Sequence, residues 1–240
     1  SLLSALEMGV YSHIDGDGRE YAITEDTAMK IRAEDGRCIR QTDISMFIHD
    51  LPNGKDTASF VTEDASGSTS QAANVIESLE SSSSLLLIDE DTSATNFMIR
   101  DELMQRVIHR DMEPIIPFID RIRELYEDHG VSSIIVAGSS GSYFHIADHI
   151  IQMDRYVPRD ITTYAKQEAE KFPLLREEVL RAGLPSFDRR PKPSPAFRAQ
   201  DRVKIKTMGR DGVMIDHETI DLRYVGQIAD PEQVAALGYC

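Results

Sequence analysis

The sequence predicts an α/β domain built on a mostly parallel sheet, followed by a small α+β appendage. Two short apolar runs, residues 85–88 and 131–137, are typical of strands that are buried on both faces, as in parallel sheets. Two helices are predicted between these runs, over residues 101–109 and 114–129, the second from apolar side chains at helical spacing. The order strand, helices, strand favours helical crossings between parallel strands.

The segment before the first apolar run is predicted to carry a helix at each end. Residues 1–8 have a helical pattern, and residues 71–80 repeat apolar side chains at helical spacing. Between them, residues 28–32 and 37–48 predict short strands, and residues 62–70 predict a loop of small side chains.

The segment after the second apolar run is predicted to continue the α/β order. We expect a short helix over residues 144–148, a third strand of the sheet over 149–153, and a long polar helix over 162–182. Four prolines within residues 184–197 predict a linker.

The C-terminal residues carry hairpin and helix signals. Residues 203–207 and 213–216 flank the turn sequence Gly209-Arg210-Asp211-Gly212, which predicts a β-hairpin. Asp230 followed by Pro231 and, two positions later, Gln233 is a typical helix start.

Composition restricts the functional classes. The 240 residues carry a formal net charge of −15, which argues against broad binding to phosphate backbones. No apolar run approaches the roughly 20 residues of a membrane-spanning helix. The two cysteines, Cys38 and Cys240, are no disulfide framework, and with no secretory leader visible we expect a cytoplasmic protein without membrane contact.

One segment runs against the acidic average. Residues 189–210 carry eight basic side chains against one acidic side chain, Asp201. They form either a patch for RNA, DNA or an acidic partner, or a solvated face that pairs with the many acids of the chain, which is the commoner role of charge runs. The basic residues are Arg189, Arg190, Lys192, Arg198, Arg202, Lys204, Lys206 and Arg210.

Two motifs point to nucleotide chemistry. The apolar run of residues 85–88 ends in Asp89 and Glu90, which is the Walker B arrangement: the strand brings carboxylates to the sheet edge where ligands bind. Residues 65–71 form a small polar loop that opens a helix, where backbone N–H groups favour an anion. Each motif has a simpler interpretation, a buried strand that ends in acids and a serine-rich helix cap.

The spacing of these motifs resembles that of ABC ATPases. Ser66 precedes Asp89 by 23 positions, as the signature serine precedes the Walker B aspartate in that family. Residues 91–96 resemble its D-loop, residues 134–137 the strand before its switch histidine, and residues 147–154 its closing segment. The soluble "predicted ATPase of the ABC class" subfamily is the most similar, over residues 9–20, 63–71, 88–101 and 113–121.

The resemblance implies ATP binding and hydrolysis in a homodimer that sandwiches the nucleotide. By resemblance, Asp89 would orient Mg²⁺ and Glu90 would act as the catalytic base. The signature residues would contact the nucleotide of the opposite subunit, and the D-loop would couple the two sites. The remaining nucleotide-binding residues that it implies are Ser66, Gly67, Ser68, Ser93 and Thr95, with Gln41 as a candidate Q-loop glutamine or a plain strand-edge side chain.

The sequence also departs from the family pattern. It contains no Gly-x-x-x-x-Gly-Lys-Ser/Thr loop, so we expect that loop to precede Ser1 and the isolated chain to be an inactive fragment. The position of the switch histidine falls at Gly138, and His145 is a weak substitute because it belongs to the next predicted helix.

Three parts and three functional hypotheses follow. A soluble ABC-class ATPase is favoured over a nucleic-acid-associated protein that uses its ATPase as a switch, and over a degenerate ATPase fold that serves as a scaffold. The expected parts are a truncated ATPase core, a helix with its linker, and a basic hairpin with a helix, over residues 1–160, 161–197 and 198–240.

Overall fold

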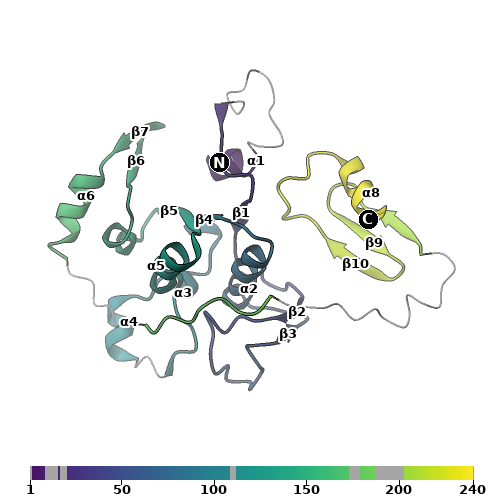
Figure 1. Ribbon diagram of the computed structural model, residues 1–240, viewed down its shortest axis with the longest axis horizontal. Coiled ribbons are helices and arrows are strands. Elements are labelled where there is room, and N and C mark those ends of the chain that lie inside the picture. Colours follow the sequence, from purple (N-terminus) through teal and green to yellow (C-terminus); the bar gives the residue numbers. More distant parts are fainter. Residues whose placement is uncertain are drawn as a thin grey trace. The chain divides into compact units, whose positions relative to one another are not determined.

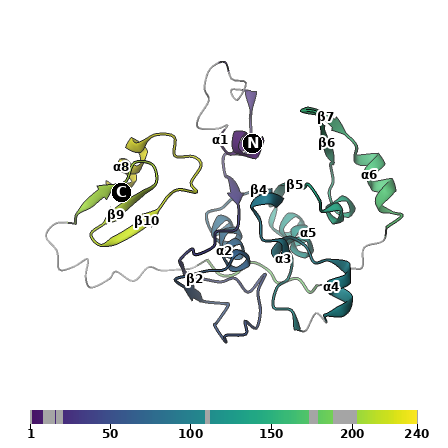
Figure 2. The same cartoon turned by 180° about the vertical axis from the view of Figure 1, so that it is seen from behind.

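The chain folds into two units, which Figures 1 and 2 show from opposite sides. One unit comprises Met29–Pro185, and the other comprises Ser1–Ala28 with Ser186–Cys240. The computed structural model describes residues 2–8, 16, 21–108, 112–172, 179–187 and 203–239.

The sheet of the larger unit confirms the predicted α/β class. It has three strands in the order β1, β4, β5, and β4 pairs with β5 in parallel. The first four residues of β4 are buried, as its uninterrupted apolar sequence predicts for a central strand. The strands span Ala28–Ile31, Leu85–Asp89 and Ser132–Val136.

β5 is less buried than its sequence suggests. Ser132, Ile134 and Val136 are exposed, and the residues between them are half-buried. β5 lies at one edge of the sheet in the described part of the chain, with β4 as its neighbour. The prediction of a strand buried on both faces was therefore wrong, because an edge strand is covered less completely than a central one.

Three helices pack together below the sheet in both views: α2 (Gly67–Glu80), α3 (Thr95–Met98) and α5 (Phe118–His129). α2 begins four residues earlier than its apolar periodicity predicts, because Ser66 caps it. α5 ends where Gly130 adopts a left-handed backbone with φ +68°. The predicted helix over residues 101–109 is α4 (Glu102–Val107).

Aromatic side chains fill the core between these helices. Phe47, Phe97 and Phe118 are fully buried. The ring centroid of Phe47 lies 5.1 Å from that of Phe97 and 6.2 Å from that of Phe118. Phe97 belongs to α3 and Phe118 to α5, so the cluster fixes the segment after β4 to the rest of the core.

A second, two-stranded sheet lies in the same unit. β2 (Ile39–Thr42) pairs antiparallel with β3 (Phe60–Thr62). The strand predicted over residues 37–48 is therefore shorter than expected. Its apolar end does not extend the strand, because Phe47 and Ile48 turn into the core, and Ile48 bridges to Ile115.

The expected third strand of the parallel sheet forms a hairpin instead. β6 (Ile151–Asp154) pairs antiparallel with β7 (Val157–Asp160). The two residues between them, Arg155 and Tyr156, have φ +48° and +68°. Two consecutive left-handed residues make the tight turn that joins antiparallel strands, so the chain reverses here. The short helix before it is the 3₁₀ helix η4 (Gly141–His145).

The predicted polar helix over residues 162–182 is wrong in its length. α6 spans Thr162–Ala169, and residues 179–187 have no regular structure. Their backbone instead bonds to two α5 side chains that are 3% and 4% exposed, Arg121 and Glu124. Arg121 Nη1 donates to the Leu180 carbonyl at 2.6 Å, and Glu124 Oε1 accepts from the N–H groups of residues 182 and 183, each at 2.7 Å.

The smaller unit confirms the C-terminal predictions and adds one strand. Its antiparallel sheet has the order β10, β9, β8 and carries α8. Gly238 of α8 lies against this sheet, because a Cβ there would be 2.7 Å from Ile205. Gln233 Oε1 accepts from the N–H of Asp230 at 2.9 Å, as in a capping box. The elements are α1 (Leu2–Met8), β8 (Ile205–Thr207), β9 (Gly212–Ile215), β10 (Glu218–Asp221) and α8 (Pro231–Tyr239).

Candidate functional site

The candidate site lies at the carboxyl end of β4. Asp89 is the last residue of the strand and is opposite Val136 of β5. Glu90 follows in η2 (Glu90–Thr92), and both acidic residues are half-buried. Because β4 and β5 are parallel, the loop after Val136 leaves the sheet beside these two carboxylates.

Asp89 organises the turn that follows the strand. Its Oδ1 accepts a hydrogen bond from the N–H of Asp91 at 3.2 Å. Its backbone carbonyl accepts from the hydroxyls of Ser93 at 2.8 Å and Thr92 at 3.3 Å. Asp89 therefore holds the turn through both its side chain and its backbone carbonyl.

The residues present fit a magnesium ion that arrives with a nucleotide. Within the described residues, no group of three or more His, Cys, Asp or Glu side chains is arranged to hold a metal. Mg²⁺ does not require such a cage, since it is usually bound by one or two carboxylates together with substrate phosphates. Asp89 supplies one carboxylate at the sheet edge where such a ligand binds.

Glu90 is bound by the loop after β5. Its Oε2 accepts from the backbone N–H groups of Gly138 at 2.7 Å and Ser139 at 3.0 Å. Its Oε1 accepts from the hydroxyl of Ser140 at 3.0 Å and from the hydroxyl of Ser139. We call residues 138–140 the Glu90-binding loop.

These hydrogen bonds lower the pKa of Glu90 to about 2, and the Ser139 hydroxyl is the largest cause. The backbone N–H groups of Ser139 and Gly138 and the hydroxyl of Ser140 act in the same direction, against the effect of burial. Donors favour the charged form of a carboxyl group. Glu90 is therefore ionised throughout the neutral range.

The predicted signature segment forms the start of α2. Ser66 is exposed, and its hydroxyl accepts from the Thr69 N–H at 3.5 Å and lies 3.0 Å from the Thr69 hydroxyl. Gly67 and Ser68 are half-buried in the first turn. The serine-rich cap and the anion-favouring helix start are thus both present, because a capped helix still directs its first N–H groups outward.

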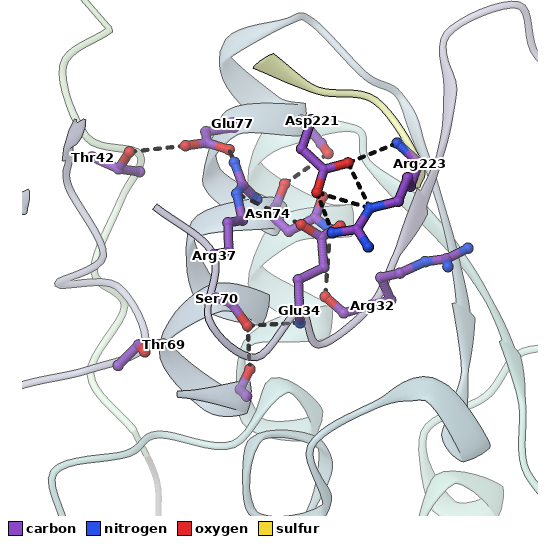
Figure 3. A network of polar contacts seen from close by, with 12 residues as sticks. Arg32, Glu34, Arg37, Thr42, Thr69, Ser70, Asn74, Glu77, Asp221 and Arg223 are labelled. Atoms are coloured by element: carbon purple, nitrogen blue, oxygen red, sulfur yellow. Dashed lines mark hydrogen bonds and ion pairs between the residues drawn. The ribbon is translucent and has the colours of Figure 1, made fainter. Parts of the chain in front are cut away.

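Gly67 has little room for a side chain. A Cβ at this position would lie 3.1 Å from Asp35 Oδ1 and 3.5 Å from the Cβ atoms of Ala33 and Ala94. The neighbouring segment is also tied to α2: the Glu34 N–H donates to the Ser70 hydroxyl at 2.8 Å, and Thr42 and Arg37 both bind Glu77 (Figure 3). This segment therefore holds α2 both near its start, at Ser70, and near its end, at Glu77.

Gln71 connects α2 to the segment after β4. Its side chain is fully buried. Its Nε2 donates to the Ser93 hydroxyl at 2.9 Å, and its Oε1 accepts from the Ala94 N–H at 2.8 Å. Ser93 in turn donates to the Asp89 carbonyl. A continuous chain of hydrogen bonds therefore runs from α2 through Gln71 and Ser93 to the strand end.

Most of the chain matches a known protein family. The family model of the ABC ATPase P-loop domain matches residues 1–190. The chain belongs to the ABC ATPase family. A second family model, the MRB1590 C-terminal domain, matches residues 204–240, which is the part of the smaller unit that carries the antiparallel sheet and α8.

A curated relative of this P-loop domain comes from an archaeon. It is an uncharacterized protein, MJ1628, of Methanocaldococcus jannaschii, and it is 30% identical over 175 residues. The match covers 72% of this chain and 38% of the relative.

The remaining predicted nucleotide-binding residues lie at different places in the P-loop domain. Ser93 is half-buried and Thr95 is exposed as the first residue of α3, so both follow the Asp89 strand end directly. Gln41 is exposed on β2, where it has φ +52°. β2 pairs with β3 in a sheet of its own, outside the sheet that carries Asp89.

The basic segment is described only in part. Lys204 and Lys206 are exposed at the start of β8, and Arg210 is exposed in the hairpin turn. The basic residues that lie outside the described residues are Arg189, Arg190, Lys192, Arg198 and Arg202.

Among the helices that the structure describes, none has the length and apolar character needed to cross a membrane.

The sequence did not predict the Glu90-binding loop or the hydrogen bonds of the Gln71 side chain to Ser93 and Ala94. In the sequence this loop stands out only by the absence of a histidine at Gly138. The signal for its role is the parallel order of the two strands, since the loop after the second strand must pass the carboxylate after the first. Gln71 offers no comparable local signal, because its partners lie 22 and 23 positions away.

Proposed function

We propose that this P-loop domain is part of a soluble protein that hydrolyses ATP with Mg²⁺. The observation that carries the proposal is the pair of carboxylates, Asp89 and Glu90, at the carboxyl end of a buried parallel strand. When bound, Mg²⁺ would neutralise charge on the phosphate oxygens. Asp89 would hold it, directly or through water, and Glu90 would accept a proton from the attacking water.

The nucleotide would lie between two copies of the chain. The start of α2, with Ser66, Gly67 and Ser68, would contact the phosphates held by the opposite subunit, because its N–H groups favour an anion. Ser93 and Thr95 would couple the two sites. Gln71 supports this arrangement, since it fixes the start of α2 to the same segment that carries these two residues. Gln41 is the candidate for an additional contact to the nucleotide.

The test uses the full-length protein, because the chain spans 38% of the length of its archaeal relative. Glu90→Gln keeps the size of the side chain and removes the base. We expect ATP turnover to fall by about 100-fold or more, since a positioned base contributes 10² or more to the rate. Phosphate release at saturating ATP and Mg²⁺ measures the change.

Glu170→Gln is the matched control, because Glu170 is exposed at the end of α6. This variant should keep the turnover of the wild type. Wild-type turnover in Glu90→Gln would contradict the proposal.

A second candidate function is binding to RNA or DNA. Lys206 of β8 and Lys204 directly before this strand are exposed, in a C-terminal part that has its own sheet, its own helix and its own family match. Lysines that contact phosphates make binding weaker as salt rises. The double variant Lys204→Glu/Lys206→Glu should abolish salt-dependent binding to single-stranded RNA or DNA in a filter-binding assay, whereas Lys171→Glu, an exposed lysine after α6, should not. Absence of salt-dependent binding in the wild type would remove this candidate.

A further inference from the structure

The Glu90-binding loop occupies both oxygens of the carboxylate that the proposed function assigns as the base. Two backbone N–H groups bind Oε2, and two serine hydroxyls bind Oε1. All four donors come from three consecutive residues, Gly138, Ser139 and Ser140. The loop is therefore complementary to this carboxylate as a whole and not to one of its atoms.

The number of donors equals the number of acceptor sites. An ionised carboxylate offers about four lone-pair positions on its two oxygens. With four donors in place, neither oxygen has a lone pair left for the proton of a water molecule.

We propose that the Glu90-binding loop is an autoinhibitory contact, which holds Glu90 in a resting position and must release Oε1 before ATP is hydrolysed. This inference rests on the proposed function of Glu90. Ser139 is the positioning residue in the contact, because it alone binds both oxygens, through its N–H and its hydroxyl.

The two oxygens differ in how easily they are released. The donors to Oε2 are backbone groups, which move only with the loop. Ser139, a donor to Oε1, is exposed, so its hydroxyl turns to water without loss of a hydrogen bond. Ser140 is 8% exposed and remains in place. Release therefore begins at the Ser139 hydroxyl and frees one lone pair of Oε1, while Glu90 stays held by the two N–H groups on Oε2 and by the Ser140 hydroxyl.

The released oxygen takes part in a balanced hydrolytic step. The water oxygen forms a bond to the terminal phosphorus of ATP, and one water proton passes to Glu90 Oε1. The bond between that phosphorus and the bridging oxygen breaks, and its electron pair leaves with ADP. Glu90 afterwards returns the proton to solvent or phosphate.

The experiment measures the kcat and KM of ATP hydrolysis by the full-length Ser139→Ala variant. We expect kcat to rise on the order of tenfold, about the effect of one hydrogen bond to a charged group, with KM unchanged. Ser139→Thr keeps the hydroxyl and should keep the kcat of the wild type. Ser142→Ala makes the same change in η4, two residues beyond Ser140, and should also leave kcat unchanged.

Two further variants separate this inference from the proposed function. Ser140→Ala removes the other hydroxyl to Oε1 and should also raise kcat. Ser139→Ala in a Glu90→Gln background should not raise kcat, because the base is absent. An unchanged or lower kcat in Ser139→Ala, with Glu90→Gln still inactive, overturns the autoinhibitory contact and leaves the proposed function intact. Wild-type turnover in Glu90→Gln overturns both.

Discussion

Gln71 and Ser93 lie 22 positions apart in the chain, and the Gln71 amide donates to the Ser93 hydroxyl at 2.9 Å. The oxygen of the same amide accepts from the Ala94 N–H. One fully buried side chain thus satisfies a donor and an acceptor of the segment after β4. This double contact links the start of α2 to the strand end that carries Asp89.

Replacement of Gln71 by leucine is expected to destabilise the domain. The Ala94 N–H would lose its buried partner, which costs about 1–3 kcal/mol, whereas the Ser93 hydroxyl would keep its bond to the Asp89 carbonyl. Urea denaturation of Gln71→Leu measures the change in the free energy of unfolding. Gln167→Leu, at an exposed position of α6, should stay within about 0.5 kcal/mol of the wild type. Equal stability of the two variants would contradict the role of Gln71.

The pair of Arg121 and Glu124 supports a second prediction. Both side chains are almost fully buried, with Nη1 of Arg121 2.9 Å from Oε2 of Glu124. Arg121→Leu leaves the Glu124 charge buried without its counter-ion, so we expect a loss of about 3–5 kcal/mol in the free energy of unfolding. Because this pair binds residues 180–183, limited proteolysis should also cut that segment faster.

Arg123→Leu on the same helix is the control. Arg123 pairs with Asp148, and the two side chains are 37% and 61% exposed. A solvent-exposed pair contributes about 1 kcal/mol or less. If Arg121→Leu lowered the free energy of unfolding no more than Arg123→Leu does, the buried pair would not stabilise the domain beyond an exposed one.

The low pKa of Glu90 predicts how stability depends on pH. Its pKa is about 2 in the folded protein, against an ordinary value of 4.5. A carboxyl group with a lowered folded pKa stabilises the fold above its unfolded pKa, and this contribution is lost as the pH falls through the folded value. Near neutral pH the wild type should therefore exceed Glu90→Gln in free energy of unfolding by on the order of 1–3 kcal/mol.

This difference should shrink as the pH falls from about 4.5 toward 2. Urea titrations of both proteins across that range measure it, with Glu170→Gln as the control whose difference from the wild type stays small. A gap between wild type and Glu90→Gln that is constant with pH would mean that the loop does not favour the ionised form.

Replacement of Phe97 tests the aromatic core. Phe97 is fully buried between Phe47 and Phe118 and directly follows the predicted D-loop. Phe97→Ala should lower the free energy of unfolding by about 3–5 kcal/mol, because it removes a large side chain and leaves a cavity. Phe172→Ala, at a position that is 72% exposed, should have little effect on the melting temperature.

The sequence predicts the elements whose signals are local. The apolar run before Asp89 gave β4, and the Asp230-Pro231 cap gave α8. The β6–β7 hairpin was missed because Arg155 and Tyr156, rather than glycine or asparagine, occupy the left-handed turn. The helix expected over residues 162–182 ends at Ala169, and the backbone of residues 180–183 makes tertiary hydrogen bonds to Arg121 and Glu124, which local sequence patterns do not predict.

Of the candidate site, only the two carboxylates at the end of β4 were predictable from the sequence. Asp89 and Glu90 follow from the pattern of a single strand. The partners of Glu90 lie 48 to 50 positions away and depend on which strands are neighbours. Local patterning carries no information on strand neighbours, so such contacts emerge only from the folded sheet.

Because β4 and β5 pair in a fixed register, the contact to Glu90 depends on the number of residues between β5 and the serines that bind it. Asp89 lies opposite Val136, and the serines that bind Glu90 begin three residues beyond that partner. One residue inserted between Val136 and Ser139 would shift both hydroxyls by one position, whereas an insertion before Ser132 would be absorbed outside the ladder. Tolerance to insertion and deletion should therefore change sharply across β5, even though most of its side chains are exposed and individually replaceable.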